Sequence, residues 1–103
     1  MSAIPFIDNE FIESHTDFEE LIHMLRSGFS EKSVETPMRH HHDYPNPKEN
    51  IDSTLLLMPS WEAGEDLGVK IVSVSPNNGK YGLPSIQGTY LYHNAHTGSL
   101  NAI

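Results

Sequence analysis

The second half of this 103-residue chain carries apolar, strand-like runs separated only by short turns. The runs are STLLLMPSW (53–61), LGVKIVSVSP (67–76) and SIQGTYLYHN (85–94), and LNAI begins a further strand after a tight turn. Parallel strands need long crossover connections, whereas antiparallel neighbours can be joined by turns of this length. The sequence therefore predicts a mostly antiparallel sheet.

One amphipathic helix is expected ahead of these strands. Its apolar residues recur with the period of one helix face, at Phe18, Ile22, Leu25 and Phe29. Thr16 and Glu19 have capping-box spacing, so the helix should begin there and end around residues 28–30. Residues 4–8 are expected to form a short strand or an extended lead-in, and residues 43–53 a loop. The predicted class is α+β, with one main helix packed on a mostly antiparallel, curved sheet.

Composition and charge exclude several classes of function. Six basic residues stand against fourteen acidic ones, and a formal charge of -8 would repel a phosphate backbone, so no nucleic-acid partner is expected. No apolar run is long enough to span a membrane, and the N-terminus lacks the features of a secretory signal. The absence of cysteine removes disulfides and thiolate zinc sites, and it fits a cytoplasmic location.

The stretch MRHHHDYP (38–45) holds three consecutive histidines. On a strand, alternation would put Arg39 and His41 on one face and His40 and His42 on the other. Two histidines on one face could ligate a transition metal together with Asp43, His93 or His96. No matching second pair occurs at ligand spacing, so ordinary strand residues are the favoured interpretation and no metal site is predicted.

Arg39 and Lys70 are the basic residues with the most interesting settings. An arginine on a strand face can grip a carboxylate with two parallel hydrogen bonds, although composition alone favours a surface arginine. Lys70 lies within an apolar run, and it shares a strand face with Val72 and Val74, which favours a partly buried setting. Pointing inward it would have a lowered pKa and could donate a proton, whereas pointing outward it would protect a strand edge. No two glycines are spaced as G-x-G, so the chain has no dinucleotide fingerprint.

Residues 36–103 resemble the N-terminal half of the ornithine cyclodeaminase and mu-crystallin family. The motifs that carry the resemblance are P-x-R followed by histidines, LLLMPSW, LGVKIVSV, GLPSIQGTYL and TG-x-x-x-AI. The residues of these motifs are most similar to those of bacterial ornithine cyclodeaminase-like and pyrroline-2-carboxylate reductase-like members. Such proteins act on amino acids, cyclic imino acids or their ketimines, with NAD(H) or NADP(H) as cofactor.

The resemblance implies roles for three residues. Arg39 stands where the family has a ligand for the substrate carboxylate. Lys70 stands where the family has a lysine that contacts the substrate and assists proton transfer, and this makes it the expected catalytic residue. Ser85 stands at a hydroxyl position that lines the same pocket.

The family continues beyond the Ala-Ile pair into a Rossmann domain, which this sequence does not contain. The resemblance therefore implies that residues 1–103 are a substrate-binding and dimerisation domain, truncated before the cofactor domain, without a cofactor site of its own and inactive alone. A non-enzymatic module that binds small carboxylates, or a purely oligomeric unit, is the alternative. Family members pair through this domain, with two sheets closing into one barrel. Apolar strand surface beyond what one helix can cover independently favours a homodimer or larger assembly.

Overall fold

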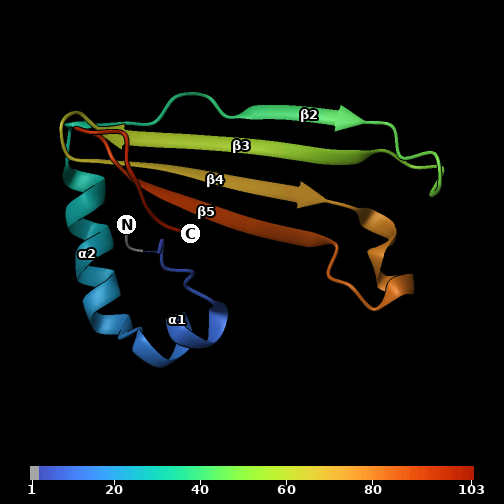
Figure 1. Ribbon diagram of the computed structural model, residues 1–103, viewed down its shortest axis with the longest axis horizontal. Coiled ribbons are helices and arrows are strands. Elements are labelled where there is room, and N and C mark those ends of the chain that lie inside the picture. Colours follow the sequence, from blue (N-terminus) through green and yellow to red (C-terminus); the bar gives the residue numbers. More distant parts are fainter. Residues whose placement is uncertain (1–2) are drawn as a thin grey trace.

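The computed structural model describes residues 3–103 as two helices followed by an antiparallel sheet (Figure 1). The helices are α1 (Asn9–His15) and α2 (Phe18–Ser30). The strands are β1 (Val34–Glu35), β2 (His40–Tyr44), β3 (Ser53–Glu62), β4 (Asp66–Val74), β5 (Ile86–Asn94) and β6 (Leu100–Ala102). A 3-10 helix, η1 (Pro76–Tyr81), joins β4 to β5. No helix among the described residues is both long and apolar enough to cross a membrane.

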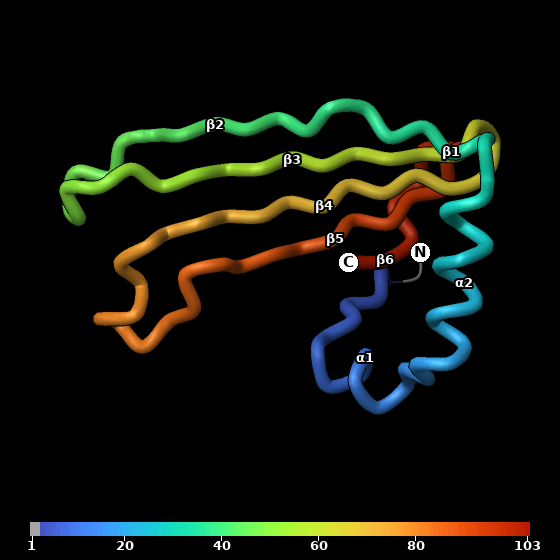
Figure 2. The backbone as a smooth tube through the Cα atoms, turned by 180° about the vertical axis from the view of Figure 1, so that it is seen from behind, coloured from blue at the N-terminus to red at the C-terminus, as the bar shows by residue number. Residues whose placement is uncertain are grey.

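The sheet is antiparallel throughout, as the short turns predicted. Strands β3, β4, β5 and β6 are hydrogen-bonded in chain order, and both β1 and β2 pair with the outer edge of β3. Front and back views show the long strands side by side, with no helix lying across them (Figures 1 and 2). The sheet of this single chain is open, so the barrel-like closure expected from the sequence is not made within one chain.

The strand register gives the sheet two faces. One face, called the Lys70 face here, carries Met58, Lys70, Val72 and Tyr90. The other, called the Leu57 face, carries Leu55, Leu57, Ile71 and Leu91. Val72 is 6% exposed and is the one buried apolar side chain among the described residues. The apolar strand residues of the Leu57 face remain only half-buried, because no second layer covers them.

Helix α2 has the residues that the apolar period predicted, but it begins on a different cap. The Asp17 carboxylate accepts hydrogen bonds from the backbone N–H groups of Glu19, at 2.9 Å, and Glu20, at 3.4 Å. The hydroxyl of Thr16 instead donates to the backbone oxygen of Ile12 and so belongs to the end of α1. The predicted capping box is therefore wrong, because an aspartate one residue later takes the capping position.

The expected packing of α2 on the sheet is also wrong. All four residues of its apolar face are exposed, with Phe18 at 76% and Phe29 at 88%. Figures 1 and 2 place both helices beyond β5, near the end of the sheet that carries β6, and not over the strands. The chain thus leaves two apolar surfaces uncovered, one on the helix and one on the sheet.

The lead-in segment before α1 is anchored by the last residues of the chain. Ile7 donates its backbone N–H to the carbonyl of Ile103 at 2.8 Å, and Ile103 donates to the carbonyl of Pro5 at 3.1 Å. These bonds satisfy the backbone of an extended segment that is not itself a regular strand. They also hold the start of α1 close to β5 and β6.

A partly buried carboxylate ties together two loops at the opposite end of the sheet. The side chain of Glu49 is 9% exposed and forms an ion pair with Lys80. It also accepts a hydrogen bond from the Tyr81 hydroxyl and one from the Asn77 amide at 3.5 Å. The Lys80 ammonium first, and then the Tyr81 hydroxyl, hold the pKa of Glu49 below its usual value. These contacts clamp the loop between β2 and β3 onto η1.

The Glu49 contacts should make folding sensitive to acid. Because the folded-state pKa is depressed, the stabilisation is fully present above the unfolded-state pKa and is lost as the pH falls through the folded one. We expect Glu49→Gln to be less stable than the wild type at pH 7, with the difference shrinking toward pH 3 in denaturant unfolding. Glu13→Gln, on the exposed surface of α1, is the matched control. A Glu49→Gln deficit that stayed constant from pH 7 to pH 3 would contradict this account.

Candidate functional site

Lys70 stands in the middle of a row of residues that runs across the sheet. It lies opposite Met58 of β3 and opposite Tyr90 of β5. Extending the β2–β3 register by one residue places Arg39 opposite Met58. Residues directly opposed in antiparallel strands point to the same face, so this row belongs to the Lys70 face.

The row places two basic residues on the same face of the sheet. Arg39 and Lys70 are separated by β3, and with adjacent strands about 4.8 Å apart their backbones are roughly 10 Å apart. Both side chains are long and exposed, but only Lys70 lines the cavity described below, and Arg39 does not. A guanidinium fork and an ammonium converging from two sides suit a carboxylate, which accepts several hydrogen bonds.

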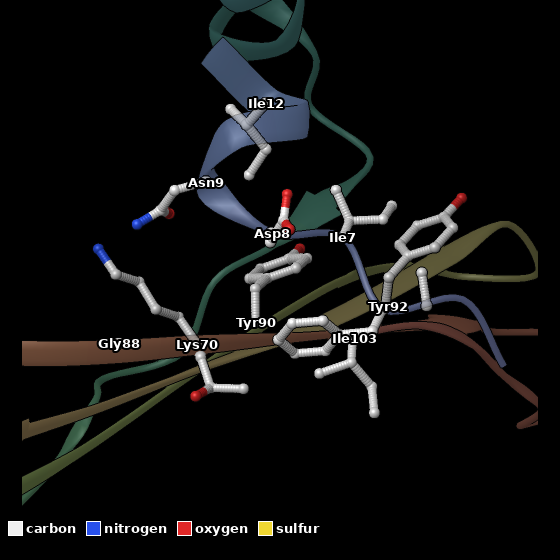
Figure 3. A pocket seen from close by; sticks show the side chains of 12 residues that line it. Ile7, Asp8, Asn9, Ile12, Lys70, Gly88, Tyr90, Tyr92 and Ile103 are labelled. Atoms are coloured by element: carbon white, nitrogen blue, oxygen red, sulfur yellow. The ribbon is translucent and has the colours of Figure 1, made fainter. Parts of the chain in front are cut away.

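A cavity of about 790 Å³ opens beside Lys70, between β5 and the segment that leads into α1 (Figure 3). Its wall is largely apolar and aromatic, formed by Phe6, Ile7, Ile12, Tyr90, Tyr92 and Ile103. Figure 3 shows the Lys70 side chain on the same side of the cavity as Asn9, with Tyr90 next to it. An apolar hollow with a few polar groups at its margin is the usual form of a small-molecule site.

Gly68 allows Tyr90 to lie down along the sheet. A Cβ atom at Gly68 would stand 1.7 Å from the Tyr90 hydroxyl oxygen and 2.4 Å from Cζ. The tyrosine therefore leans diagonally away from its partner Lys70 and covers the glycine, which is buried. The neighbouring Tyr92 donates its hydroxyl proton to Asp66, and this hydrogen bond is the main cause of the raised pKa of Tyr92. Both rings are thus positioned as cavity wall.

The structure separates the three site residues named from the sequence. Arg39 and Lys70 share a row, but Ser85 precedes β5, five residues before Tyr90 and therefore roughly 17 Å along the strand. The Ser85 hydroxyl donates to the backbone oxygen of Pro76 at 3.3 Å. Lys70 itself is exposed, not partly buried as expected, because Val72 takes the covered position on this face.

The cavity also contains residues that the sequence analysis did not name. Tyr90 and Tyr92 alternate along β5 and so share the Lys70 face, a signal present in the TYLY motif once the pairing with β4 is known. Phe6, Ile7 and Ile12 come from the opposite end of the chain and carry no motif. Backbone hydrogen bonds between Ile103 and residues 5–7 hold the lead-in beside the site.

The histidine triplet is divided between the two faces, as alternation predicted. The His41 Nε2 atom lies 3.0 Å from an Asp43 carboxylate oxygen, which also accepts a hydrogen bond from the Thr54 hydroxyl at 2.6 Å. The Thr54 bond first, and then His41, lower the pKa of Asp43. No group of three or more histidine, aspartate or glutamate side chains is placed to hold a metal ion anywhere in residues 3–103.

The described residues form a small α+β domain with an open antiparallel sheet and an apolar cavity beside Lys70. Comparison with known proteins gives its family. The family model for the ornithine cyclodeaminase/mu-crystallin family matches residues 6–103. The chain belongs to this family.

Two curated relatives support the assignment by sequence. An uncharacterised protein of Schizosaccharomyces pombe is 42% identical over 95 residues, covering 90% of this chain and 28% of the relative. Protein SAR DEFICIENT 4 of Arabidopsis thaliana is 36% identical over 104 residues, covering 95% of this chain and 30% of the relative. The chain thus spans about 30% of the length of the relatives it matches.

Solved structures agree on the fold. The Thermococcus litoralis Δ1-pyrroline-2-carboxylate reductase, in complex with NADH and L-proline, aligns with 96% of this chain and 31% of its own, at a TM-score of 0.79 and 29% identity. An archaeal alanine dehydrogenase dimer with bound NAD aligns with 96% of this chain and 30% of its own, at a TM-score of 0.79 and 20% identity. A lysine cyclodeaminase aligns with 98% of this chain and 32% of its own, at a TM-score of 0.76 and 24% identity. The last two establish the fold alone.

Substitution of Gly68 should disturb the cavity through Tyr90. Gly68→Ala forces the tyrosine ring off its present position, and we expect a loss of about 1 kcal/mol or more in the free energy of unfolding. Gly88→Ala is the matched control on the next strand, because its added Cβ would meet only ordinary contacts at 3.8 Å. Denaturant unfolding measures both variants. Equal stability of Gly68→Ala and Gly88→Ala would show that Tyr90 does not need this glycine.

Proposed function

We propose that this chain is the substrate-binding part of an NAD(P)-dependent protein that acts on an amino acid or a cyclic imino acid. The observation that carries the proposal is the cross-strand row that puts Arg39 and Lys70 on one face, on either side of Met58. In this proposal Arg39 and Lys70 hold the substrate carboxylate. Lys70 is also the catalytic residue, because an ammonium next to the bound substrate can transfer a proton, which the fixed charge of arginine cannot.

The cavity beside Lys70 would receive the carbon skeleton of the substrate. Its aromatic and aliphatic walls suit a compact apolar body, while the basic pair fixes the carboxylate at one end. L-proline, the ligand of the Thermococcus litoralis reductase, has this combination of a carboxylate and a small apolar ring. Ser85 as a substrate ligand has less support, since its hydroxyl is already bonded to Pro76 at the far end of β5.

The cofactor of the proposed reaction would be bound outside these residues. The solved structures of the reductase and of the alanine dehydrogenase contain NADH and NAD, which supports a nicotinamide cofactor for the proposed protein. The present sequence contains no G-x-G motif, and its described residues, with every strand pair antiparallel, form no βαβ unit that could cradle a pyrophosphate. We therefore propose that the chain alone binds no nicotinamide cofactor and is inactive until a dinucleotide-binding domain is supplied.

Association of two copies is the second part of the proposal. The Leu57 face is an apolar sheet surface without a covering layer, and β2 presents an unpaired outer edge. Closing two such sheets around a two-fold axis would cover the apolar face and pair the free strand edge. The alanine dehydrogenase of the same fold is a dimer, in keeping with this arrangement. A homodimer or larger assembly in the cytoplasm, where a cysteine-free chain needs no oxidation, is the proposed form.

A non-enzymatic role makes partly different demands on the same residues. A binding module would use the apolar faces together with the Arg39–Lys70 pair, and an oligomerisation module would use the apolar faces alone. Neither would need proton transfer from Lys70. Lysine is needed for proton transfer, whereas any cation at that position serves for binding. Lys70→Arg in the protein joined to a dinucleotide-binding domain would therefore separate the two roles.

The carboxylate site can be tested on the chain as it is. L-proline should bind to the wild type in a calorimetric titration, and Arg39→Met and Lys70→Met should each weaken binding at least about tenfold, the typical loss when a charge-assisted bond is removed. Lys48→Met, on a distant loop, is the matched control and should bind as the wild type does. NADH should give no heat with any of these proteins. Proline binding that survives in both Met variants would overturn the assignment of the pair.

The association should depend on the Leu57 face. Sedimentation at micromolar concentration should give at least a dimer, with an interface of order 2,000 Å² or more in total. Leu57→Glu should shift the protein toward monomer, because it buries a charge against the apolar partner face. Met58→Glu changes the neighbouring residue on the opposite face and should leave the assembly intact. Sedimentation of Phe29→Glu tests whether the exposed face of helix α2 also takes part in the assembly. A monomeric wild type would refute the proposed assembly.

A further inference from the structure

The cavity beside Lys70 contains an acidic side chain that the proposed function does not use. Asp8 lines the cavity from the segment that leads into α1, whereas Lys70 lines it from β4 (Figure 3). It is the one carboxylate side chain of the cavity wall within residues 3–103. The cavity therefore holds two opposite charges in a wall that is otherwise largely apolar. It lies beside the Lys70 face, away from the Leu57 face that the proposed assembly would cover.

The Asp8 carboxylate has an oxygen left for a ligand. Its Oδ1 atom accepts the backbone N–H of Phe11 at 2.9 Å and so caps α1. The second oxygen accepts no hydrogen bond from any residue that the structure describes. An ionised carboxylate has roughly four acceptor positions, so most of its capacity is unused. The carboxylate of Asp66, by contrast, already accepts the Tyr92 hydroxyl and does not line the cavity.

The two charges of the cavity are not paired with each other. Neither Asp8 nor Lys70 takes part in an ion pair within residues 3–103, so a gap separates the ammonium from the carboxylate. Two charge-assisted hydrogen bonds of about 2.8 Å, with the headgroup of an amino acid between them, span roughly 5–8 Å. The exposed lysine side chain can adjust to such a span by rotation about its own bonds.

We propose that Asp8 binds the substrate nitrogen while Lys70 binds the substrate carboxylate. The cavity then selects a substrate whose nitrogen is positively charged, as the ammonium of an amino acid or the iminium of a cyclic imino acid. A carboxylic acid without that nitrogen binds more weakly, because it covers the Asp8 charge without pairing it. This inference rests on the proposed function, from which it takes the role of Lys70.

Asparagine can replace Asp8 without loss of the helix cap. Asparagine and aspartate are about equally favourable capping residues, so Asp8→Asn removes the charge and keeps an acceptor for the Phe11 N–H group. Asp17→Asn makes the same change at the cap of α2, outside the cavity, and is the matched control. An effect confined to Asp8→Asn therefore comes from the charge in the cavity.

The test is a calorimetric titration of the whole chain at pH 7.5 with two ligands, L-proline and tetrahydrofuran-2-carboxylate, which has oxygen in place of the ring nitrogen. The wild type should bind proline at least about tenfold more tightly than the ring ether, the usual effect of one charge-assisted bond. Asp8→Asn should weaken proline binding about tenfold without weakening the binding of the ring ether. Asp17→Asn should bind both ligands as the wild type does, and Lys70→Met should weaken both.

The outcomes separate this inference from the proposed function. Proline binding that depends on Lys70 but is unchanged in Asp8→Asn would overturn the role of Asp8 and leave the carboxylate site standing. An equal loss of both ligands in Asp8→Asn would also overturn it, because the effect would then not concern the nitrogen. If the wild type binds neither ligand, or binds both without need of Lys70, the proposed function fails and this inference fails with it.

Discussion

The backbone register of β2, β3, β4 and β5 is the constraint on which the rest of the structure depends. It determines which side chains share a face, and a slip of one residue in any pair would send every side chain of that strand to the other side. The register puts Arg39, Met58, Lys70 and Tyr90 in one row and leaves His40 and His42 on the opposite face. The proposed carboxylate site follows from this arrangement.

Local contacts then form the cavity beside the paired strands. Gly68 gives Tyr90 the space to lie flat, and the bonds between Ile7, Pro5 and Ile103 bring the lead-in segment over β5. At the far end, Glu49 joins the loops that flank the strands, so both ends of the sheet are tied by specific interactions. The middle of the sheet has little such support within one chain, since Val72 is the one buried apolar side chain in the part of the chain that the structure describes. Association of two copies would supply the missing layer.

The sequence predicted the long strands well because their apolar and β-branched runs are bounded by clear turns. It predicted the sharing of a face by Lys70, Val72 and Val74 from alternation alone. It missed α1, a seven-residue helix with too few apolar residues to show a period. It placed the cap of α2 on Thr16 because Thr16 and Glu19 have capping-box spacing, whereas the neighbouring Asp17, the stronger capping residue, takes the position. The position of Ser85 relative to Lys70 and the exposure of Lys70 depend on register and neighbouring layers, which no local pattern encodes.

The central claim is that Arg39 and Lys70 hold one carboxylate above Met58, and a crystal structure of this chain with L-proline tests it most directly. The account predicts that the proline carboxylate lies between the Arg39 guanidinium and the Lys70 ammonium, within about 3 Å of a nitrogen of each, with the ring directed toward Tyr90. A proline molecule bound elsewhere would contradict the account. So would an Arg39 side chain on the Leu57 face while the Lys70 side chain stays on the opposite face.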